Sequence, residues 1–516
     1  MNLQGSRSNL ILAAALLGIF SLATYLAAHH VADGDLWAKL ALGASVWLRG
    51  ELFRHDVFAF TPVLPKYIDH EWGSGVIFFG ALRFAGSGGL MLLKTFLCLG
   101  AVAWPLLAAR RNGNKWPVLL LLAIPCALCI LPGYIPTVRS HAFTYFFFGA
   151  ILWCLEEIKR GHERAAWCLP VLFLLWANLH GGFVAGLGTL AVYVAEALLL
   201  RRQIKMFLII AVCSAAVTLI NPYGLDFWRY LVPALLHPRP RILEWQPLSL
   251  FGFDPFLGFR ILFVGVLAVV ILEWRRAEKK SWSGLVMLAI TAFLGWRSRR
   301  HAPFFGVAAL VFAAPYFEMT LARVRNALPL LRRSDPATAV LAAYLIASGF
   351  VATRFLANAS WQVLAPVGHD PVREADILAR ANVSGNLAVP FGWGSYAAWR
   401  LFPKIKISHD GRYEAAYPES TFELNNAFFE KHPQDWDRLI REYRVDFVIL
   451  DLQHEQLRPE DLRDRGYDLI WMHKGISALL ARSDVTRELK KAAADLPPTT
   501  IDPLDANIPR RWWQSP

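Results

Sequence analysis

Residues 10–48 read LILAAALLGIFSLATYLAAHHVADGDLWAKLALGASVWL, a long apolar run followed by an acidic pair and an amphipathic segment. The run 10–29 is long enough to cross the hydrocarbon core of a bilayer. Asp33 and Asp35 follow it, and the next apolar residues recur at helical spacing. We therefore expect a helix in the membrane interface that holds both carboxylates at the mouth of a helical bundle, with its polar side chains facing away, namely Lys39, Ser45 and Arg49.

The apolar pattern recurs along the first two thirds of the chain. Hydrophobic residues make up 55% of the 516 residues, with 20 Trp and 34 Phe, which is far too apolar for one soluble domain. We expect a polytopic α-helical membrane protein with about eleven transmembrane helices. The expected spans are 10–29, 88–109, 117–133, 142–158, 166–179, 182–200, 205–220, 259–273, 283–296, 303–318 and 337–356.

Charge sets the expected orientation of these spans. The net charge is +13, and the Lys and Arg gather in short loops that can all face the cytoplasm, so no nucleic-acid partner is needed to explain them. The pattern predicts a multi-pass protein of the cell (inner) membrane with a cytoplasmic N-terminus. The segment 72–84 is short for a crossing and is expected to be interfacial or re-entrant. A cleaved signal peptide is the alternative for the first segment.

The chain changes character after about residue 356. Short strand-like and helix-like runs alternate there, which predicts a C-terminal extracytoplasmic α/β domain over 357–483. Before it, residues 1–356 form the expected transmembrane domain, with a first outer loop at 30–72. Residues 484–516 contain several prolines and are expected to be an extended tail. The expected strands are 386–390, 404–408, 446–450 and 477–481, and the expected helices are 396–402, 419–430 and 436–443.

Short sequence motifs occur in a fixed order along most of the chain. They are DGDLWAKLALG (33–43), HDVFAFTP (55–62), YIDHEW (67–72), RSHAFTYF (139–146), WANLHGGF (176–183), NPYG (221–224), EWQ (244–246) and RRHAPFF (299–305). In this order the sequence resembles the integral membrane glycosyltransferases of the GT-C superfamily, in the bacterial set related to protein and lipid A glycosyltransferases and to Rgt-type sugar transferases. The resemblance implies a GT-C-like fold, a polyprenyl-phosphate sugar donor, transfer outside the cytoplasm and a catalytic acid in the first outer loop. That role falls on Asp33 and Asp35, and either could be the base.

Glycosyl transfer from a phosphodiester also needs cations to neutralise the leaving group. Four residues in outer loops are candidates for binding the donor phosphate, because charged groups at membrane depth are costly and arginine suits phosphate oxygens: Arg139, Arg299, Arg300 and His301. Their alternative is a structural role, as headgroup anchors or as ion pairs with outer-loop acids.

Other polar residues are candidates for substrate contact or support: His70, Glu71, His141, His180, Glu244, Asp410 and Arg412. His180 has a structural imidazole as its alternative, and Glu244 beside Trp245 either binds a sugar or lies in the aromatic belt. Binding of a divalent cation by His70 and Glu71 is a further possibility that the sequence leaves open. Asp410 and Arg412 either pair with each other or position the acceptor.

These features favour a membrane glycosyltransferase that moves a sugar from a polyprenyl-phosphate donor to an extracytoplasmic acceptor. The expected partners are that donor, membrane lipids, and a lipid, glycan or protein of the cell envelope. A lipid-linked glycan transporter or flippase is the alternative, although its charges would be expected near the bilayer midplane rather than at one face. A non-catalytic membrane assembly protein is the third possibility.

Overall fold

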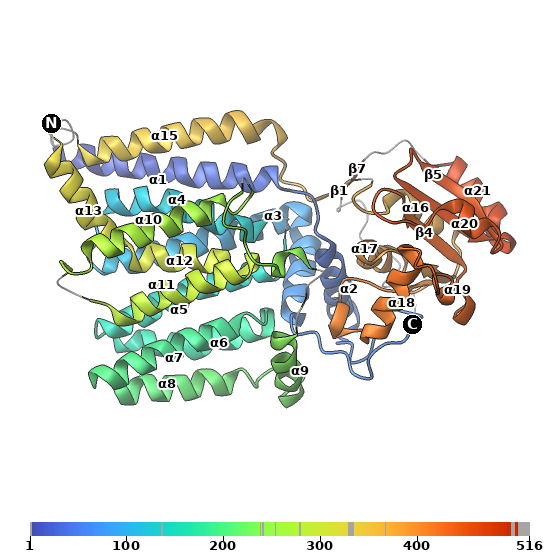
Figure 1. Ribbon diagram of the computed structural model, residues 1–516, viewed down its shortest axis with the longest axis horizontal. Coiled ribbons are helices and arrows are strands. Elements are labelled where there is room, and N and C mark those ends of the chain that lie inside the picture. The colour runs from blue at the N-terminus through green and yellow to red at the C-terminus, as the bar shows by residue number, and fades with distance from the viewer. Residues whose placement is uncertain are drawn as a thin grey trace. The chain divides into compact units, whose positions relative to one another are not determined.

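The computed structural model describes residues 3–135, 138–237, 239, 242–252, 254–277, 280–328, 335–366, 368–496 and 501–503 (Figure 1). The chain folds as two compact units, each made of two separate stretches of sequence. Unit 1 comprises Met1–His30 and Met91–Trp361, and unit 2 comprises Val31–Leu90 and Gln362–Pro516.

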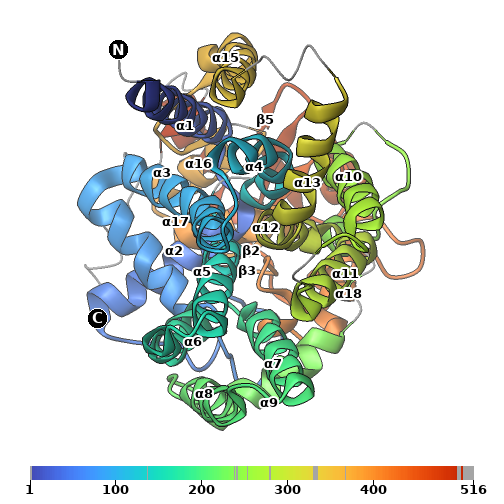
Figure 2. The same ribbon diagram turned by 90° about the vertical axis from the view of Figure 1, so that its left-hand side faces the viewer.

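Unit 1 is a bundle of helices that run side by side, seen nearly end-on in Figure 2. Helices α1 and α15 pack along each other, as do α4 with α12 and α6 with α8. In chain order the helices are α1 (Leu3–Ala28), the second part of α3 (Trp72–Arg111), α4 (Trp116–Ile130), α5 (His141–Lys159), α6 (Cys168–Leu179), α7 (Phe183–Leu200), α8 (Ile204–Val217), α9 (Leu225–Leu236), α10 (Leu257–Glu273), α11 (Trp282–Arg297), α12 (Ala302–Phe312), α13 (Ala314–Ala327) and α15 (Pro336–Phe355).

Each expected span corresponds to one of these helices or to a helix pair, but the count of about eleven crossings is not confirmed. Five helices in the described ranges are long and apolar enough to cross a membrane, or six if α12 and α13 form one broken span. That pair was expected as one span over 303–318, and it bends by 61° instead. Large apolar side chains remain exposed on the outside of the bundle, including Leu12 and Leu16 of α1 and Ile346 and Phe350 of α15. Such surfaces suit lipid, as in an integral membrane protein.

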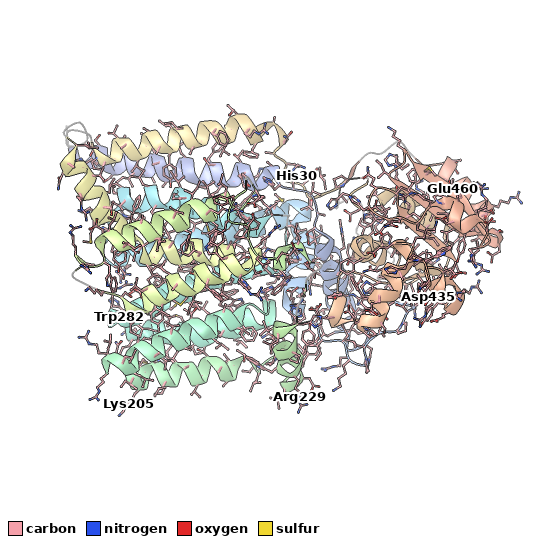
Figure 3. All side chains as sticks on the ribbon, in the orientation of Figure 1. His30, Lys205, Arg229, Trp282, Asp435 and Glu460 are labelled. Atoms are coloured by element: carbon pink, nitrogen blue, oxygen red, sulfur yellow. The ribbon has the colours of Figure 1, made fainter. Side chains whose placement is uncertain are left out.

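The basic loops of unit 1 gather at one end of the bundle. Lys205 and Trp282 lie at that end, and His30 and Arg229 lie at the other (Figure 3). Ion pairs join several of these loops, because Arg111 at the end of α3 binds Glu157, and Lys159 binds Glu196 at 2.7 Å. The charge asymmetry expected from the sequence is therefore present in the folded bundle.

Unit 2 is built around a five-stranded mixed sheet with the order β3-β2-β4-β6-β5. Strand β2 pairs in parallel with β3 and β4, whereas β4, β6 and β5 pair antiparallel. A second sheet contains β1 and β7. The strands are β1 (Leu364–Pro366), β2 (Gly385–Ala388), β3 (Ile405–Ile407), β4 (Phe447–Asp451), β5 (Tyr467–His473), β6 (Ser477–Arg482) and β7 (Ile501–Pro503). The helices are α2 (Gly34–Arg49), the first part of α3, α16 (Val372–Ala381), α17 (Phe391–Leu401), α18 (Glu419–Phe429), α19 (Arg438–Glu442), α20 (Pro459–Arg463) and α21 (Thr486–Ala494).

The α/β character and the four expected strands are found, and three further strands are added. The first outer loop, expected as part of the transmembrane domain, belongs to unit 2 together with the C-terminal region. Val31 bridges Leu364 and Ala59 bridges Ile407, so the loop extends both sheets. The expected extended tail begins with α21, while its residues 497–500 and 504–516 lie outside the described ranges.

Helix α2 also differs in its surroundings. Its first three turns are buried, and Lys39 and Ser45, expected to face away, are among the buried residues. Within unit 2 the helix packs against α17 and crosses α3 so closely that a Cβ added at Gly43 would lie 2.0 Å from the carbonyl oxygen of Gly75. The amphipathic pattern therefore reflects packing against protein.

Candidate active site

In unit 1, two arginines share one carboxylate at the end of the bundle opposite to the basic loops. Arg139 Nη1 donates to Glu244 Oε2 at 2.9 Å, and Arg300 Nη1 donates to Glu244 Oε1 at 2.6 Å. Burial alone would raise the pKa of Glu244, but Arg300 and Arg139 hold that pKa at about 2. The group therefore carries a net positive charge at neutral pH. The three side chains are between 15 and 27% exposed, so a ligand can still approach them.

Three separate segments of the chain position this cluster. Arg139 precedes α5, Glu244 lies in the short 3-10 turn η3 (Leu243–Trp245), and Arg300 lies in the 3-10 turn η4 (Arg299–His301). The backbone of the two turns is joined, since Arg299 N–H donates to Gln246 O at 3.1 Å. Tyr145 Oη donates to the carbonyl oxygen of Arg300 at 3.0 Å. The arginines are thus fixed by the chain and not only by their ion pairs.

The motif around His180 joins the same cluster. Arg300 Nη2 lies 3.2 Å from His180 Nε2, and His180 Nδ1 lies 2.7 Å from Thr144 Oγ1 and accepts the Gly182 N–H at 2.9 Å. Trp176 Nε1 donates to the same Thr144 oxygen at 3.0 Å. A Cβ added at Gly182 would lie 2.2 Å from Thr144 Oγ1. Glycine is therefore needed here so that the backbone can approach the Thr144 side chain, and not only to form a tight turn.

The remaining candidates of unit 1 have different environments. His301 lies beside Trp245, and burial together with Arg300 lowers the pKa of its imidazole to about 4, so it is neutral rather than cationic. Arg299 has a buried Nε atom without a hydrogen-bond partner among the described residues. His141 is 6% exposed and lies 2.7 Å from Gly133 O, which indicates a structural imidazole. The Arg300 guanidinium stacks 5.2 Å from the Trp245 ring centroid.

In unit 2, the acidic pair begins α2. Asp33 is the N-cap of the helix, and its Oδ1 accepts the N–H of Asp35 at 3.0 Å. Both carboxylates are half-buried. An added Cβ at Gly411 would lie 3.4 Å from Asp35 Oδ1, so the motif HDGRY (409–413) reaches the start of α2.

A third motif completes this arrangement. An added Cβ at Gly34 would lie 3.5 Å from the carbonyl oxygen of Gly392, in the motif FGWGSY (391–396). An added Cβ at Gly394 would lie 1.9 Å from the carbonyl oxygen of His409, a distance that only glycine permits. The three motifs, far apart in sequence, therefore meet at the N-terminus of α2.

Arg412 pairs with Asp410 and also joins two motifs of the first outer loop. Its Nε donates to Asp410 Oδ2 at 2.9 Å, and its Nη1 binds Asp56. The guanidinium also lies over the rings of Phe58 and Tyr67. Because all three charged side chains are at most 4% exposed, this group is closed to a substrate.

The acidic motif YIDHEW is already paired with a cation, Lys39 of α2. Lys39 Nζ donates to Asp69 Oδ1 at 2.6 Å and lies 3.1 Å from Glu71 Oε2. Burial alone would lower the pKa of Lys39, but the two carboxylates outweigh it and raise that pKa. His70 lies next to Glu71, and burial lowers the pKa of its imidazole. The described residues include no group of three or more His, Cys, Asp or Glu placed to hold a metal ion.

Several residues of these groups were not among the sequence candidates. Thr144, Tyr145 and Trp176 lie inside the motifs, but nothing in their residue types distinguishes them from aromatic and hydroxyl residues in packing roles. Asp56 and Lys39 were visible as charges in the first outer loop. Lys39 pairs with Asp69 and Glu71 of the same loop, whereas only the packing of the loop against the C-terminal region identifies Arg412 as the partner of Asp56.

Known structures share this architecture. The archaeal oligosaccharyltransferase AglB of Archaeoglobus fulgidus, solved with an inhibitory peptide and a dolichol-phosphate, superposes with a TM-score of 0.57 and 13% identity over 85% of this chain and 69% of that chain. An oligosaccharyltransferase of the same organism, tethered to an acceptor peptide with the NVT sequon, gives a TM-score of 0.54 and 12% identity over the same shares. ArnT from Cupriavidus metallidurans, bound to undecaprenyl phosphate, gives a TM-score of 0.53 and 12% identity over 92% of this chain and 98% of that chain.

AglB and ArnT are membrane glycosyltransferases of the GT-C superfamily, so the chain has the GT-C fold expected from its motifs. No protein-family model and no curated protein matches the sequence.

Proposed function

We propose that this chain, which has the fold of the GT-C membrane glycosyltransferases, transfers a sugar from a polyprenyl-phosphate donor to an acceptor outside the cytoplasm. The observation that carries the proposal is the partly exposed cluster of Arg139, Glu244 and Arg300. Its net positive charge suits a phosphodiester, and arginine forks match phosphate oxygens. The solved structures of AglB and ArnT contain a polyprenyl phosphate, which supports a donor of that class.

In the proposed reaction, an acceptor hydroxyl attacks the anomeric carbon of the donor sugar. A bond forms between the acceptor oxygen and that carbon, the bond from the carbon to the phosphate oxygen breaks, and the electron pair leaves with the lipid phosphate. Arg139 and Arg300 stabilise this departing charge, with Arg299 as a further cation. The acceptor proton passes to a carboxylate at the start of α2, Asp35 or Asp33.

Transfer can be tested with the purified full-length protein in proteoliposomes and a panel of polyprenyl-phosphate sugars. The measurements are release of the polyprenyl phosphate and appearance of the sugar on cell-envelope lipid, glycan or protein acceptors. Asp33→Asn and Asp35→Asn are nearly isosteric but cannot take the proton, so at least one should lose about 10²–10⁴-fold in rate. Near wild-type transfer by both variants would exclude this acidic pair as the source of the base.

The same assay distinguishes the alternatives. Movement of the lipid-linked sugar across the bilayer without transfer would indicate a flippase, and neither activity would favour an assembly role. Repeating the assay with a chelator determines whether a divalent cation is required. Reporter fusions placed after residue 356 test the proposed orientation, which requires an extracytoplasmic C-terminal region.

A further inference from the structure

A second pair of titratable residues lies beside the acidic pair of unit 2. His369 and Asp370 form a turn between β1 and α16, and His369 Nδ1 lies 3.1 Å from Asp370 Oδ2. The Asp370 side chain is 1% exposed, whereas the His369 side chain is 50% exposed. A buried carboxylate therefore holds one nitrogen of an accessible imidazole, which fixes the orientation of the ring.

Two indoles hold this turn in place, one from each of two motifs described above. Trp37 Nε1, on α2, donates to Asp370 Oδ1 at 3.0 Å. Trp393 Nε1, on α17, donates to the carbonyl oxygen of His369 at 2.9 Å. Both oxygens of Asp370 are thus engaged, one by α2 and one by His369. The turn is consequently tied to the helix that begins with Asp33 and Asp35.

The carboxylates around His369 all raise the pKa of its imidazole. The hydrogen bond that His369 donates to Asp370 raises the pKa of His369, burial opposes it, and the negative charges of Asp370 and Asp33 raise that pKa further. The charged groups that act on the ring are Asp370 in its own turn and Asp33 at the N-cap of α2, and the Trp393 indole of α17 binds the carbonyl oxygen of His369. The imidazolium and the Asp33 carboxylate stabilise each other.

We propose that His369, oriented by Asp370, is a positioning residue that keeps the Asp33 carboxylate oriented beside Asp35. The inference rests on the proposed transferase function, and it divides the acidic pair into two roles. Asp33 caps α2 and receives the charge of His369, whereas Asp35, beside Gly411, takes the acceptor proton. Neither His369 nor Asp370 needs to touch the substrate.

The electrostatic part is tested without activity, by NMR titration of the full-length protein labelled with ¹³Cε1 histidine. The resonance that disappears in His369→Gln identifies His369. Its pKa should lie above the ordinary value and should fall in both Asp370→Asn and Asp33→Asn. In Asp370→Asn the introduced amide would donate to Nδ1 and so favour the neutral ring. An unchanged His369 pKa in Asp33→Asn would overturn the inference, whatever reaction the protein performs.

The functional part is tested by kinetics. His369→Gln should lower kcat by about tenfold to a hundredfold while the KM for the donor stays within about twofold, because positioning affects the reacting geometry rather than donor binding. Wild-type activity should fall as the pH rises through the His369 pKa, and Asp370→Asn should move that fall to lower pH. The double variant His369→Gln with Asp33→Asn should be no slower than Asp33→Asn alone.

A matched control exists in the same unit. His454 Nδ1 lies 2.8 Å from Asp451 Oδ2 in a similar pair, but its side chain is 75% exposed and lies in the turn after β4. His454→Gln should leave kcat and the pH profile unchanged. Equal effects of the two histidine substitutions, or a wild-type pH profile in His369→Gln, would contradict the positioning role. Because the half-exposed His369 side chain has little packing to lose, His369→Gln remains informative even if Asp370→Asn fails to fold.

Discussion

The two units of the molecule contain charged groups of opposite arrangement. In unit 1 one carboxylate, Glu244, lies between two arginines and all three are partly exposed. In unit 2 one arginine, Arg412, lies between two carboxylates and all three are almost fully buried. The sequence contains charges of the same kind in both places, and burial separates their roles. The exposed group can exchange its internal partner for a ligand, whereas the buried group can only hold the fold together.

Arg412→Ala should give the largest effect on stability. Removal of the guanidinium leaves Asp410 and Asp56 as buried charges, which should lower the free energy of unfolding of unit 2 by about 3–5 kcal/mol. Denaturant unfolding followed by Trp fluorescence and limited proteolysis measures this loss. Arg412→Lys keeps the charge but loses the planar fork, so it should be intermediate. Unfolding at the wild-type denaturant concentration would show that the group is not structural.

Arg300→Ala should affect donor use instead of folding. Loss of one cation from a partly buried phosphate contact typically costs about 2–5 kcal/mol, so the donor affinity should fall by well over tenfold. Donor-concentration dependence of transfer, or direct binding of a polyprenyl phosphate, provides the measurement. Arg229→Ala on α9 is the control, because that arginine is 76% exposed and pairs with Asp226 within its own helix turn. Equal donor affinity in wild type and Arg300→Ala would make the unit 1 group structural as well.

Glu374→Gln tests what burial does to a carboxylate when the charge of a neighbouring arginine, Arg373, does not outweigh it. Burial raises the pKa of Glu374 to about 7, and its Oε1 atom has no hydrogen-bond partner among the described residues. The folded state therefore binds this proton more tightly than the unfolded state, so stability is highest below about pH 4.5 and falls as the pH rises towards 7. Glu374→Gln should remove that fall and stabilise unit 2 at pH 8 by up to about 3 kcal/mol. Parallel unfolding curves at pH 5 and pH 8 measure the difference, and an unchanged pH dependence would refute the effect of burial.

Arg438→Ala should have the smallest effect. Arg438 and Glu442 form an ion pair across one turn of α19 at 2.6 Å, but their side chains are 51% and 44% exposed. Water and salt screen such a pair, so the unfolding midpoint should not move measurably. A shift as large as that of Arg412→Ala would mean that burial is not what distinguishes the charged groups.

Sequence reasoning located most of the helices because apolar length and periodicity are local properties. The spans 142–158 and 337–356 differ from α5 and α15 by only one residue at each end. It did not anticipate the bend within the span 303–318, which occurs at Ala313, two residues before Pro315. Strand β5 was missed because its burial alternates irregularly around a bulge between Leu469 and Trp471.

From the sequence, the candidate site was predictable only as a set of residue types expected at one face of the membrane. Arg139, Glu244 and Arg300 were each identified by their outer-loop position, and the expected alternative of ion pairing with an outer-loop acid is what the structure shows for two of the arginines. The functional roles of these residues and of Asp33 and Asp35 stay predictions. His369 and Asp370 were not identified, because a His-Asp dipeptide in a polar region carries no signal until its neighbours are known.

The sequence by itself determined the membrane class, the location of most helices, the charge asymmetry and the order of the motifs. All of these depend on composition and spacing within a few tens of residues. Only the tertiary structure decided which unit contains the first outer loop, that Lys39 faces two carboxylates, and that Arg412 joins residues more than 350 positions apart in sequence. Such pairings arise from strand bridges and close glycine contacts between distant segments, and no local pattern records them. The difference between an accessible and a closed charged group likewise depends on burial, which the folded chain alone defines.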